Sequence, residues 1–360
     1  MLSIETKHLI WKGFKEENIH NPFIAGMINK NNFSLNKSDY KSSIGLACSP
    51  MGAAFFIIPF INAITRSGTM EEKDLIFKSM LSKYAFEILP STKRGHKEGD
   101  TESIVEQALR VVTNVKNRQS KAEEEGMALL EKKIEEDEML RYPTLIFTLE
   151  PNQIDRNIAG LVANRLANRY QRSCLVLTRV NSINPETNQL ENHYMGSGRG
   201  FSMDGPSRFK EQCLETGLLD FGAGHLGAFG LSLDERNLDD FKKELNKQFA
   251  DAASELTYYV DYCFNENDTN ISDKILTIAD MNDYWGKDLD RAMVGMEFIS
   301  DPSKFKVMAK GTLKFDLNNG ISIIKFGGTE EEIELFSNKQ VKVKAYCKCN
   351  KNEWYGVVSA

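Results

Sequence analysis

The segments Tyr194–Gly200 (YMGSGRG) and Gly222–Gly230 (GAGHLGAFG) decide the fold that this sequence predicts. Their glycines predict two turns, at which backbone N–H groups can approach an anionic ligand closely. Arg199 adds a planar guanidinium suited to phosphate, and His225 adds a short-range hydrogen-bond donor. The pattern predicts a site for a phosphodiester or a nucleotide, and two ordinary tight turns are the alternative.

Strand-like and helix-like patterns alternate on both sides of these segments. Strands are predicted at 145–149, 174–180, 228–233 and 256–263, and helices at 155–170, 207–216 and 235–250. Such alternation is typical of an α/β domain, in which ligands bind beyond the ends of the strands. Both glycine-rich turns are expected at that position.

A long amphipathic helix is predicted before this domain. Its apolar stripe runs from Ile104 to Ile134, Asp100 or Thr101 is the predicted N-cap, and Glu102 is expected in the first turn. A helix of about 40 residues is near 60 Å long, which is longer than most helices of globular proteins. Such a helix is expected to connect two lobes. Earlier still, residues 43–63 are small and apolar, and a helix over 59–68 would place Asn62 and Arg66 on one face.

The C-terminal part is rich in predicted strands. They lie at 306–317, 320–326, 340–349 and 354–358, are separated by Asn-Asn-Gly and Gly-Gly turns, and carry interleaved lysines. The pattern indicates a small barrel or sheet of the OB type. Trp354 is a candidate for stacking a nucleobase, and packing in the core is the alternative.

Composition excludes several classes of protein. A net charge of −6 argues against a uniformly basic nucleic-acid coat, although it permits a local basic groove. No apolar run reaches the roughly 18–20 residues of a membrane helix, and the N-terminus has no secretory pattern. The scattered cysteines indicate reduced thiols in a cytoplasmic protein, and the lone Cys347-Lys348-Cys349 does not predict a zinc site.

Several segments together resemble the RecJ-type single-stranded-DNA exonucleases of the DHH phosphoesterase superfamily. Ile154–Val162 (IDRNIAGLV), followed by the two glycine-rich segments, resembles their DHH-associated domain. The segment Pro59–Ala63 (PFINA) with Arg66 resembles the end of their DHH domain. Asn117-Arg118-Gln119 resembles a motif on their connecting helix, and 350–356 (NKNEWYG) resembles their OB-like segment. The similarity covers most of the chain in the family's order.

The resemblance implies an α/β chain of four parts. Residues 1–90 are the remnant of a DHH domain, and residues 91–142 form the connecting helix. Residues 143–265 form the DHH-associated substrate-binding domain. Residues 266–360 hold a linker and an OB-like β domain that is incomplete at the C-terminus.

The departures from the family concern the chemistry. No Asp-His-His motif is present, because none of the five histidines stands beside an aspartate or another histidine. We therefore predict no catalytic residue and no metal ligand in this chain. The metal-bearing N-terminal part is expected to be missing, and a separate chain is one possible source of it. Mn²⁺ or Mg²⁺ is expected for the complete enzyme, in which two ions activate water for hydrolysis.

The resemblance also implies which residues hold single-stranded DNA. The predicted phosphate-binding set is Ser197, Gly198, Arg199, Gly224, His225, Asn62, Arg66 and Arg118. Each has a structural alternative: a surface arginine beside a turn for Arg199, a structural hydrogen bond for His225, and a solvated helix face for Arg118.

The predicted function is the substrate-binding part of an exonuclease that works 5′ to 3′ by resemblance, and that is inactive by itself. A non-catalytic accessory protein that binds single strands or nucleotides is the first alternative. The second is a relative that hydrolyses oligonucleotides or cyclic dinucleotides. A cytoplasmic protein with no membrane partner is expected in each case.

Overall fold

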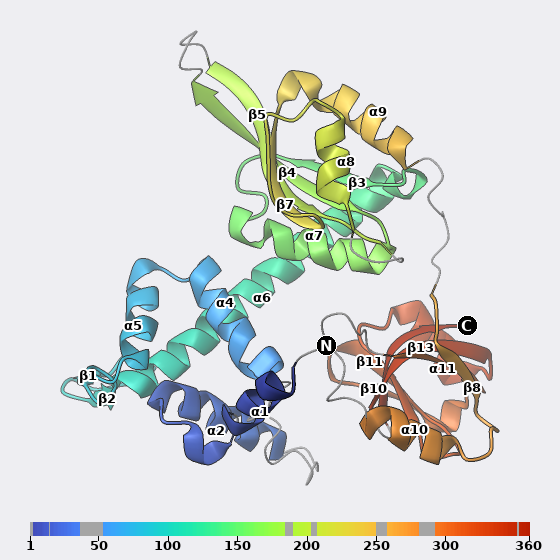
Figure 1. Cartoon of the computed structure of the whole chain (residues 1–360), viewed down its shortest axis with the longest axis horizontal. Coiled ribbons are helices and arrows are strands. Elements are labelled where there is room, and N and C mark those ends of the chain that lie inside the picture. The colour runs from blue at the N-terminus through green and yellow to red at the C-terminus, as the bar shows by residue number, and fades with distance from the viewer. Residues whose placement is uncertain are drawn as a thin grey trace. The chain divides into compact units, whose positions relative to one another are not determined.

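The computed structural model describes residues 3–13, 15–36, 53–183, 190–202, 207–249, 258–280, 292–350 and 353–360 (Figure 1). Residues 43–52 of the predicted apolar run and residues 351–352 of the OB-like motif lie outside these ranges. The chain divides into two units, His8–Leu256 and Met1–Lys7 with Thr257–Ala360. The α/β class predicted from the sequence is confirmed, since both helices and mixed sheets are present.

Helices dominate the N-terminal part of the first unit. In chain order they are α1 (Ile4–Gly13, which begins in the other unit), η1 (Glu16–Asn18), α2 (Pro22–Asn36), η2 (Ala53–Ile57), α4 (Ile58–Ser67) and α5 (Met70–Met80). A short hairpin, β1 (Ile88–Pro90) and β2 (Thr101–Ser103), leads into the long helix α6 (Ile104–Glu136). The core here joins α2, α4 and α5 to α6 through buried residues such as Phe23, Ile64 and Val112.

The long helix is confirmed, but its predicted start is wrong. Its N-cap is Ser103, whose hydroxyl accepts from the Glu106 N–H while the Glu106 carboxylate accepts from the Ser103 N–H. This reciprocal capping box satisfies two donors at once, whereas Thr101 is committed to the β1–β2 ladder. The helix has 33 residues, fewer than predicted, because it ends at Glu136 and the 3₁₀ turn η3 (Met139–Arg141) follows.

Glu102 lies in β2 and not in the first turn of the helix. Its side chain is fully buried and accepts from both terminal nitrogens of Arg110, each at 2.6 Å, and from the Thr92 N–H at 2.9 Å. Hydrogen bonding by Arg110, partly opposed by burial, lowers the pKa of Glu102 to about 2. The pair fastens the β1–β2 hairpin to α6.

Replacing this carboxylate is expected to make stability less dependent on pH. The pKa of Glu102 in the folded state is below its usual 4.5, so the stabilisation is complete above about pH 5 and is lost as pH falls toward 2. Glu102→Gln should cost about 2–3 kcal/mol at pH 7, and this difference should shrink by pH 3. Urea unfolding at both pH values measures it, with the exposed Glu98→Gln as control. Equal losses at pH 7 and pH 3 would contradict the assignment.

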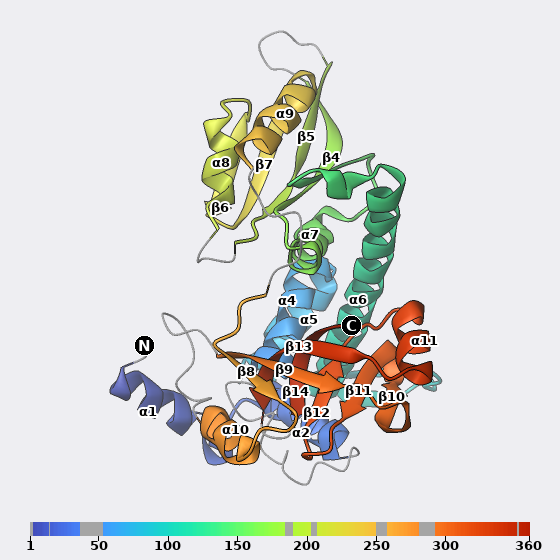
Figure 2. The ribbon, with the colours of Figure 1, turned by 90° about the vertical axis from the view of Figure 1, so that its right-hand side faces the viewer.

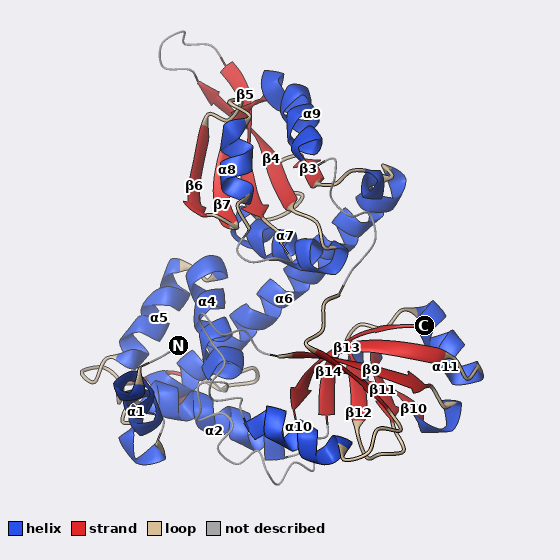
Figure 3. Cartoon of the chain, turned by 45° about the vertical axis from the view of Figure 1, so that its right-hand side comes forward, coloured by secondary structure: helices blue, strands red, loops and turns tan. Residues whose placement is uncertain are grey.

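The rest of the first unit is built on a five-stranded sheet in the order β3-β4-β5-β7-β6. The strands are β3 (Leu145–Leu149), β4 (Cys174–Ile183), β5 (Leu190–Arg199), β6 (Phe221–His225) and β7 (Ala228–Asp234). Strands β3 and β4 pair in parallel, and the other neighbouring pairs of this sheet are antiparallel. Helix α7 (Arg156–Tyr170) covers one face, while α8 (Phe209–Glu215), η4 (Glu235–Asn237) and α9 (Leu238–Gln248) lie on the other (Figure 3).

The glycine-rich segments are not the turns that the sequence predicts. Gly196 and Gly198 lie inside β5, and Gly222 and Gly224 lie inside β6. A Cβ on Gly196 would stand 1.9 Å from the Val176 carbonyl oxygen, and one on Gly198 would stand 2.5 Å from the Phe229 ring. These glycines therefore allow close packing within the sheet, and the actual turn is Leu226-Gly227 between β6 and β7.

The second unit contains a seven-stranded mixed sheet in the order β10-β11-β12-β14-β13-β9-β8. Its strands are β8 (Tyr262–Asn265), β9 (Met293–Ile299), β10 (Phe305–Met308), β11 (Thr312–Asp316), β12 (Ser322–Lys325), β13 (Lys342–Asn350) and β14 (Glu353–Ser359). Its helices are α10 (Ile271–Asp280), η6 (Pro302–Lys304), η7 (Ala309–Gly311) and α11 (Glu330–Asn338). The strand predicted at 256–263 overlaps β8 only at Tyr262 and Cys263, and residues 256–257 lie outside the described ranges. β8 pairs with β9 in this sheet and not with the sheet of the first unit.

Candidate nucleic-acid interface

Arg199 and His225 lie in one row across three strands of the five-stranded sheet. Arg199 of β5 is opposite Ala228 of β7, and Ala228 is opposite His225 of β6. Directly opposed residues of antiparallel strands point to the same face, so both polar side chains share a face. Arg199 is also opposite Cys174, which packs in the core beneath α7. The shared face is therefore the one that α7 partly covers.

Small residues form the floor beside Arg199. Ser197 is opposite Gly230, which is opposite Ala223, so the second row carries one hydroxyl and almost no other side chain. Ala223 and His225 are exposed, while Ala228 and Gly230 are half-buried. A floor of small residues lets a ligand backbone lie close to the sheet.

The Arg199 guanidinium occupies space that Gly160 of α7 leaves open. A Cβ on Gly160 would stand 2.4 Å from Arg199 Nη2 and 3.3 Å from Ser197 Oγ. Arg199 Nη1 donates to the Gly198 carbonyl oxygen at 2.6 Å. Burial lowers the pKa of Arg199, and the nearby Arg66 lowers it further. Among the described residues, Arg199 is thus a half-buried cation without a carboxylate partner.

Arg66 of α4 carries a second positive charge, close enough to lower the pKa of Arg199. This helix packs against α7, which packs in turn against β5 (Figure 2). Arg66 is exposed, and it has no ion pair within the described ranges. Asn62 is one helical turn earlier, is exposed, and shares the face of Arg66 as predicted. Two neighbouring guanidinium groups that lack a carboxylate in this part of the structure form a site that an anion would stabilise.

Arg118 and Gln119 of α6 hold the end of α4 in place. Arg118 pairs with Glu72 at 2.9 Å and donates to the Ser67 carbonyl oxygen at 3.1 Å. The Gln119 amide donates to Ser67 Oγ at 3.1 Å. Since Ser67 follows Arg66 directly, these contacts position Arg66. Arg118 is engaged in these protein contacts, and its predicted phosphate contact stays a prediction.

Gly198 and Gly224, predicted to bind phosphate, have structural roles in the sheet. Gly198 is buried in a central strand with ladders on both sides, so its backbone groups serve the sheet. Gly224 has a φ of +128°, and its carbonyl oxygen accepts from the Lys210 ammonium at 2.8 Å. This bond ties the start of α8 to the residue before His225. The sequence pattern did not single out Lys210 or Gly160 for the site.

The predicted stacking role of Trp354 is wrong, because the side chain is 0% exposed. Its ring packs edge-on against Phe264 in the core of the seven-stranded sheet, so no ring face is open to a base. Aromatic side chains do lie on the outer face. Phe326 stacks on Tyr355 with centroids 5.9 Å apart, and Tyr346 packs on Tyr258 at 4.7 Å.

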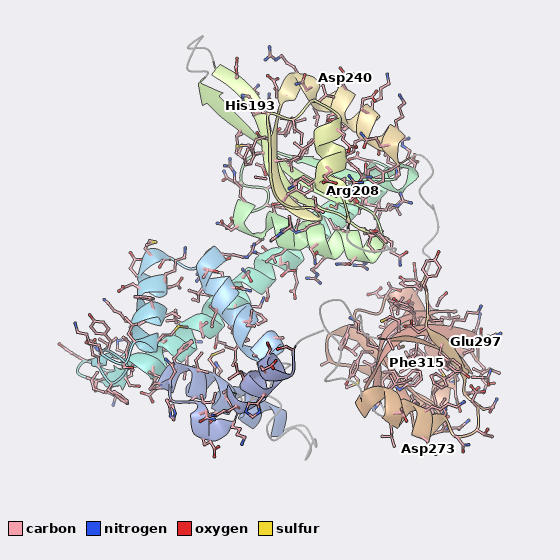
Figure 4. All side chains as sticks on the ribbon, in the orientation of Figure 1. His193, Arg208, Asp240, Asp273, Glu297 and Phe315 are labelled. Atoms are coloured by element: carbon pink, nitrogen blue, oxygen red, sulfur yellow. The ribbon has the colours of Figure 1, made fainter. Side chains whose placement is uncertain are left out.

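Lysines of β13 share this outer face. Lys342, Lys344 and Lys348 alternate with the buried Val343, Ala345 and Cys347. Glu297 of β9 (Figure 4) pairs with Lys342 at 3.5 Å and with Lys344 at 3.6 Å. Lysines combined with aromatic rings are typical of surfaces that bind single-stranded nucleic acids.

Comparison with solved structures identifies the fold. RecJ of Thermus thermophilus in complex with Mn²⁺ superposes with a TM-score of 0.56 and 15% identity, over 96% of this chain and 46% of that chain. Its Mg²⁺ complex gives 0.54 and 14% identity, over 96% and 48%. This chain has the RecJ fold. The resemblance predicted from the sequence is confirmed, although no protein-family model matches the chain.

The sequence is also similar to two curated relatives. The SPbeta prophage-derived YorK of Bacillus subtilis strain 168, provisionally named a single-strand DNA-specific exonuclease, is 29% identical over 98% of this chain. The YorK protein of Bacillus phage SPbeta gives the same values. The chain spans 59% of the length of these relatives and about half of the Thermus RecJ chains.

The Thermus RecJ structures hold Mn²⁺ or Mg²⁺. The residues of the candidate interface in this chain do not fit a divalent ion. Arg66 and Arg199 would repel a cation, and Ser197 and His225 supply only one hydroxyl and one imidazole. Within the described ranges, no three His, Cys, Asp or Glu side chains gather in a way that could hold a metal. The same ranges contain no helix that is long and apolar enough to cross a membrane.

Proposed function

We propose that this chain holds single-stranded DNA for a RecJ-like exonuclease, and that it does not cut the strand by itself. The observation that carries the proposal is that the positive charges of Arg66 on α4 and Arg199 on β5 act on each other, where α4 packs on α7 and α7 packs on β5. Two cations from different elements lie near one another without a carboxylate partner in the described residues. Such an arrangement costs free energy in the absence of a ligand, and a bound phosphate offsets that cost.

The rows of the sheet suggest how the strand is held. One phosphate lies between the guanidinium groups of Arg66 and Arg199, where the Ser197 hydroxyl can donate to it. The sugar-phosphate backbone then follows the floor of Ala228 and Gly230 toward His225. His225 and Lys210 supply donors for a neighbouring phosphate or sugar oxygen. Asn62 supplies an amide on the opposite side.

The outer face of the seven-stranded sheet favours single-stranded DNA over a short ligand such as a cyclic dinucleotide. Phe326, Tyr355 and Tyr346 offer surfaces for bases, and Lys348 offers a charge. A cyclic dinucleotide needs no such second surface. Cleavage of the strand, 5′ to 3′ by resemblance, is assigned to a part that carries divalent-metal ligands, whether on the same polypeptide or on a separate chain.

Fluorescence anisotropy with labelled oligonucleotides in EDTA tests the binding part of the proposal. The chain should bind a single-stranded 20-mer more tightly than the duplex of the same sequence. The logarithm of affinity should fall linearly with the logarithm of salt concentration as phosphate contacts release counterions. Absence of binding at low salt, or equal affinity for the duplex, would refute it.

Gly160→Ala is expected to weaken strand binding without weakening the fold. The added Cβ would lie 2.4 Å from Arg199 Nη2, so the guanidinium must leave its present position. Alanine is favoured over glycine in a helix by about 1 kcal/mol, which offsets the cost of the displacement. We expect binding to fall by about 3- to 10-fold while the free energy of unfolding stays level or rises.

Anisotropy and urea unfolding of the same preparation measure the two quantities. Ala163→Gly, at a buried position later in α7 that packs in the core of the sheet, is the matched control. It should lower stability and leave strand affinity within about twofold. The reverse pattern would show that Gly160 serves the fold alone.

A further inference from the structure

A cavity of about 610 Å³ opens at the edge of the five-stranded sheet that is farthest from β6. It is bounded by the end of α6, by η3 and Tyr142, by β3, and by α9, the helix that carries Asp240 in Figure 4. Because β5, which carries Arg199, is two strands away, this cavity is separate from the interface described above. Its volume is that of a small-molecule site.

Basic side chains outnumber acidic ones in its lining. Lys133, Arg141, Lys242 and Lys243 face Asp137 and Asp239, which leaves a surplus of two positive charges in a chain whose net charge is −6. In the described part of the chain, no carboxylate pairs with Lys133, Lys242 or Lys243. Lysines from two helices thus converge on one cavity, as expected for a phosphate-binding site.

The backbone of β3 supplies a second kind of recognition. Its neighbour in the described sheet is β4, and the Leu145 N–H donates to the Ser173 carbonyl oxygen on that side. In a strand, alternate residues direct their N–H and C=O groups to opposite sides. Those of Ile146 and Thr148 therefore point away from β4, and both residues line the cavity. A strand edge offers a donor and an acceptor in fixed order, which suits the edge of a nucleobase.

Tyr142 supplies a flat surface. Its ring is 39% exposed, and the Arg141 guanidinium lies 4.9 Å from its centroid. Thr144 Oγ1 donates to Asn246 Oδ1 at 2.6 Å, which ties β3 to α9. The cavity therefore combines a cationic group, a hydrogen-bonding edge and an aromatic plane.

We infer that this cavity binds a nucleoside phosphate. The phosphate contacts Lys133, Lys242 and Lys243, and the base contacts the free edge of β3 and the Tyr142 ring. This site does not depend on the single-strand interface, and nothing in the comparisons assigns it.

Isothermal titration calorimetry of the full chain in EDTA tests the inference, with ATP, dAMP and inorganic triphosphate as separate ligands. ATP or dAMP should bind, and inorganic triphosphate should bind at least several-fold more weakly than ATP because it lacks a base. No binding of either nucleotide at millimolar concentration would overturn the inference, as would equal affinities for ATP and triphosphate.

Two double variants locate the site. Lys242→Gln with Lys243→Gln should weaken nucleotide binding about tenfold or more, since two charge-assisted contacts are lost. Lys132→Gln with Lys247→Gln changes exposed lysines of the same helices, α6 and α9, outside the cavity lining, and should alter affinity less than twofold. If the Lys242→Gln, Lys243→Gln double variant of α9 unfolds, Lys133→Gln on α6 tests the same site. Retained affinity in both cavity variants, or loss of nucleotide binding in Arg199→Ala, would contradict the placement.

Discussion

Replacing Arg199 with alanine is expected to weaken single-strand binding by about 10- to 100-fold. A charge-assisted hydrogen bond to phosphate is worth roughly 1.5–3 kcal/mol, and each 1.4 kcal/mol is a factor of ten in affinity. The slope of log affinity against log salt should also fall by about 0.7, the value for one contact to a single strand. Anisotropy titrations at several salt concentrations give both quantities.

The same substitution should not lower stability. Arg199 is half-buried, has no carboxylate partner in the described residues, and lies beside Arg66. Removing a cation in that position relieves repulsion, so the free energy of unfolding should stay level or rise. Arg208→Ala is the control, because Arg208 (Figure 4) is exposed and pairs with Glu211 on α8. It should leave affinity unchanged. Full affinity in Arg199→Ala would remove the basis of the proposed interface.

Replacing Trp354 with alanine is expected to destabilise the C-terminal unit by about 3–5 kcal/mol. The side chain is completely buried and packs in the same core as Phe264 and Phe315, so its removal leaves a large cavity. Differential scanning calorimetry should show an earlier transition for this unit, while the transition of the first unit is unchanged.

Phe326→Ala is the matched control for Trp354. Phe326 is 66% exposed and stacks on Tyr355. Its loss should cost less than about 1 kcal/mol in stability but should weaken strand binding, since stacking contributes roughly 1–3 kcal/mol per base. Trp354→Phe, which keeps an aromatic ring in the core, completes the comparison. If this variant is fully folded but binds single-stranded DNA more weakly, while Phe326→Ala binds normally, Trp354 has the stacking role after all.

The sequence predicts helices better than strand pairing in this protein. Helix periodicity is a local property of the sequence. The apolar stripe from Ile104 to Ile134 and the segment that forms α7 therefore predict their helices without knowledge of the rest of the fold. The turns predicted at Gly196 and Gly198 are wrong because the role of these glycines depends on Val176 and Phe229, which are distant in sequence. Glycine is equally compatible with a turn and with crowded strands.

In the candidate site too, residues marked by local sequence context are predicted, and residues whose role depends on distant contacts are not. Arg199, Ser197, His225 and Arg66 were predicted from glycine context and family resemblance. Gly160 lies in the IDRNIAGLV segment, yet its contact with Arg199 exists only after α7 packs on β5. Trp354 could not be assigned from sequence because alternation along β14 puts it on the buried face, and the register that decides this is set by β12 and β13.

The most direct test of the account incubates this chain alone with a 5′-labelled single strand and Mn²⁺ at low salt, then measures bound fraction and strand length from the same tube. The account predicts a strand that is bound and intact, with binding reduced in Arg199→Ala. Degradation that requires Mn²⁺ and is abolished by EDTA would contradict it, because a chain that only holds the strand cannot cut it.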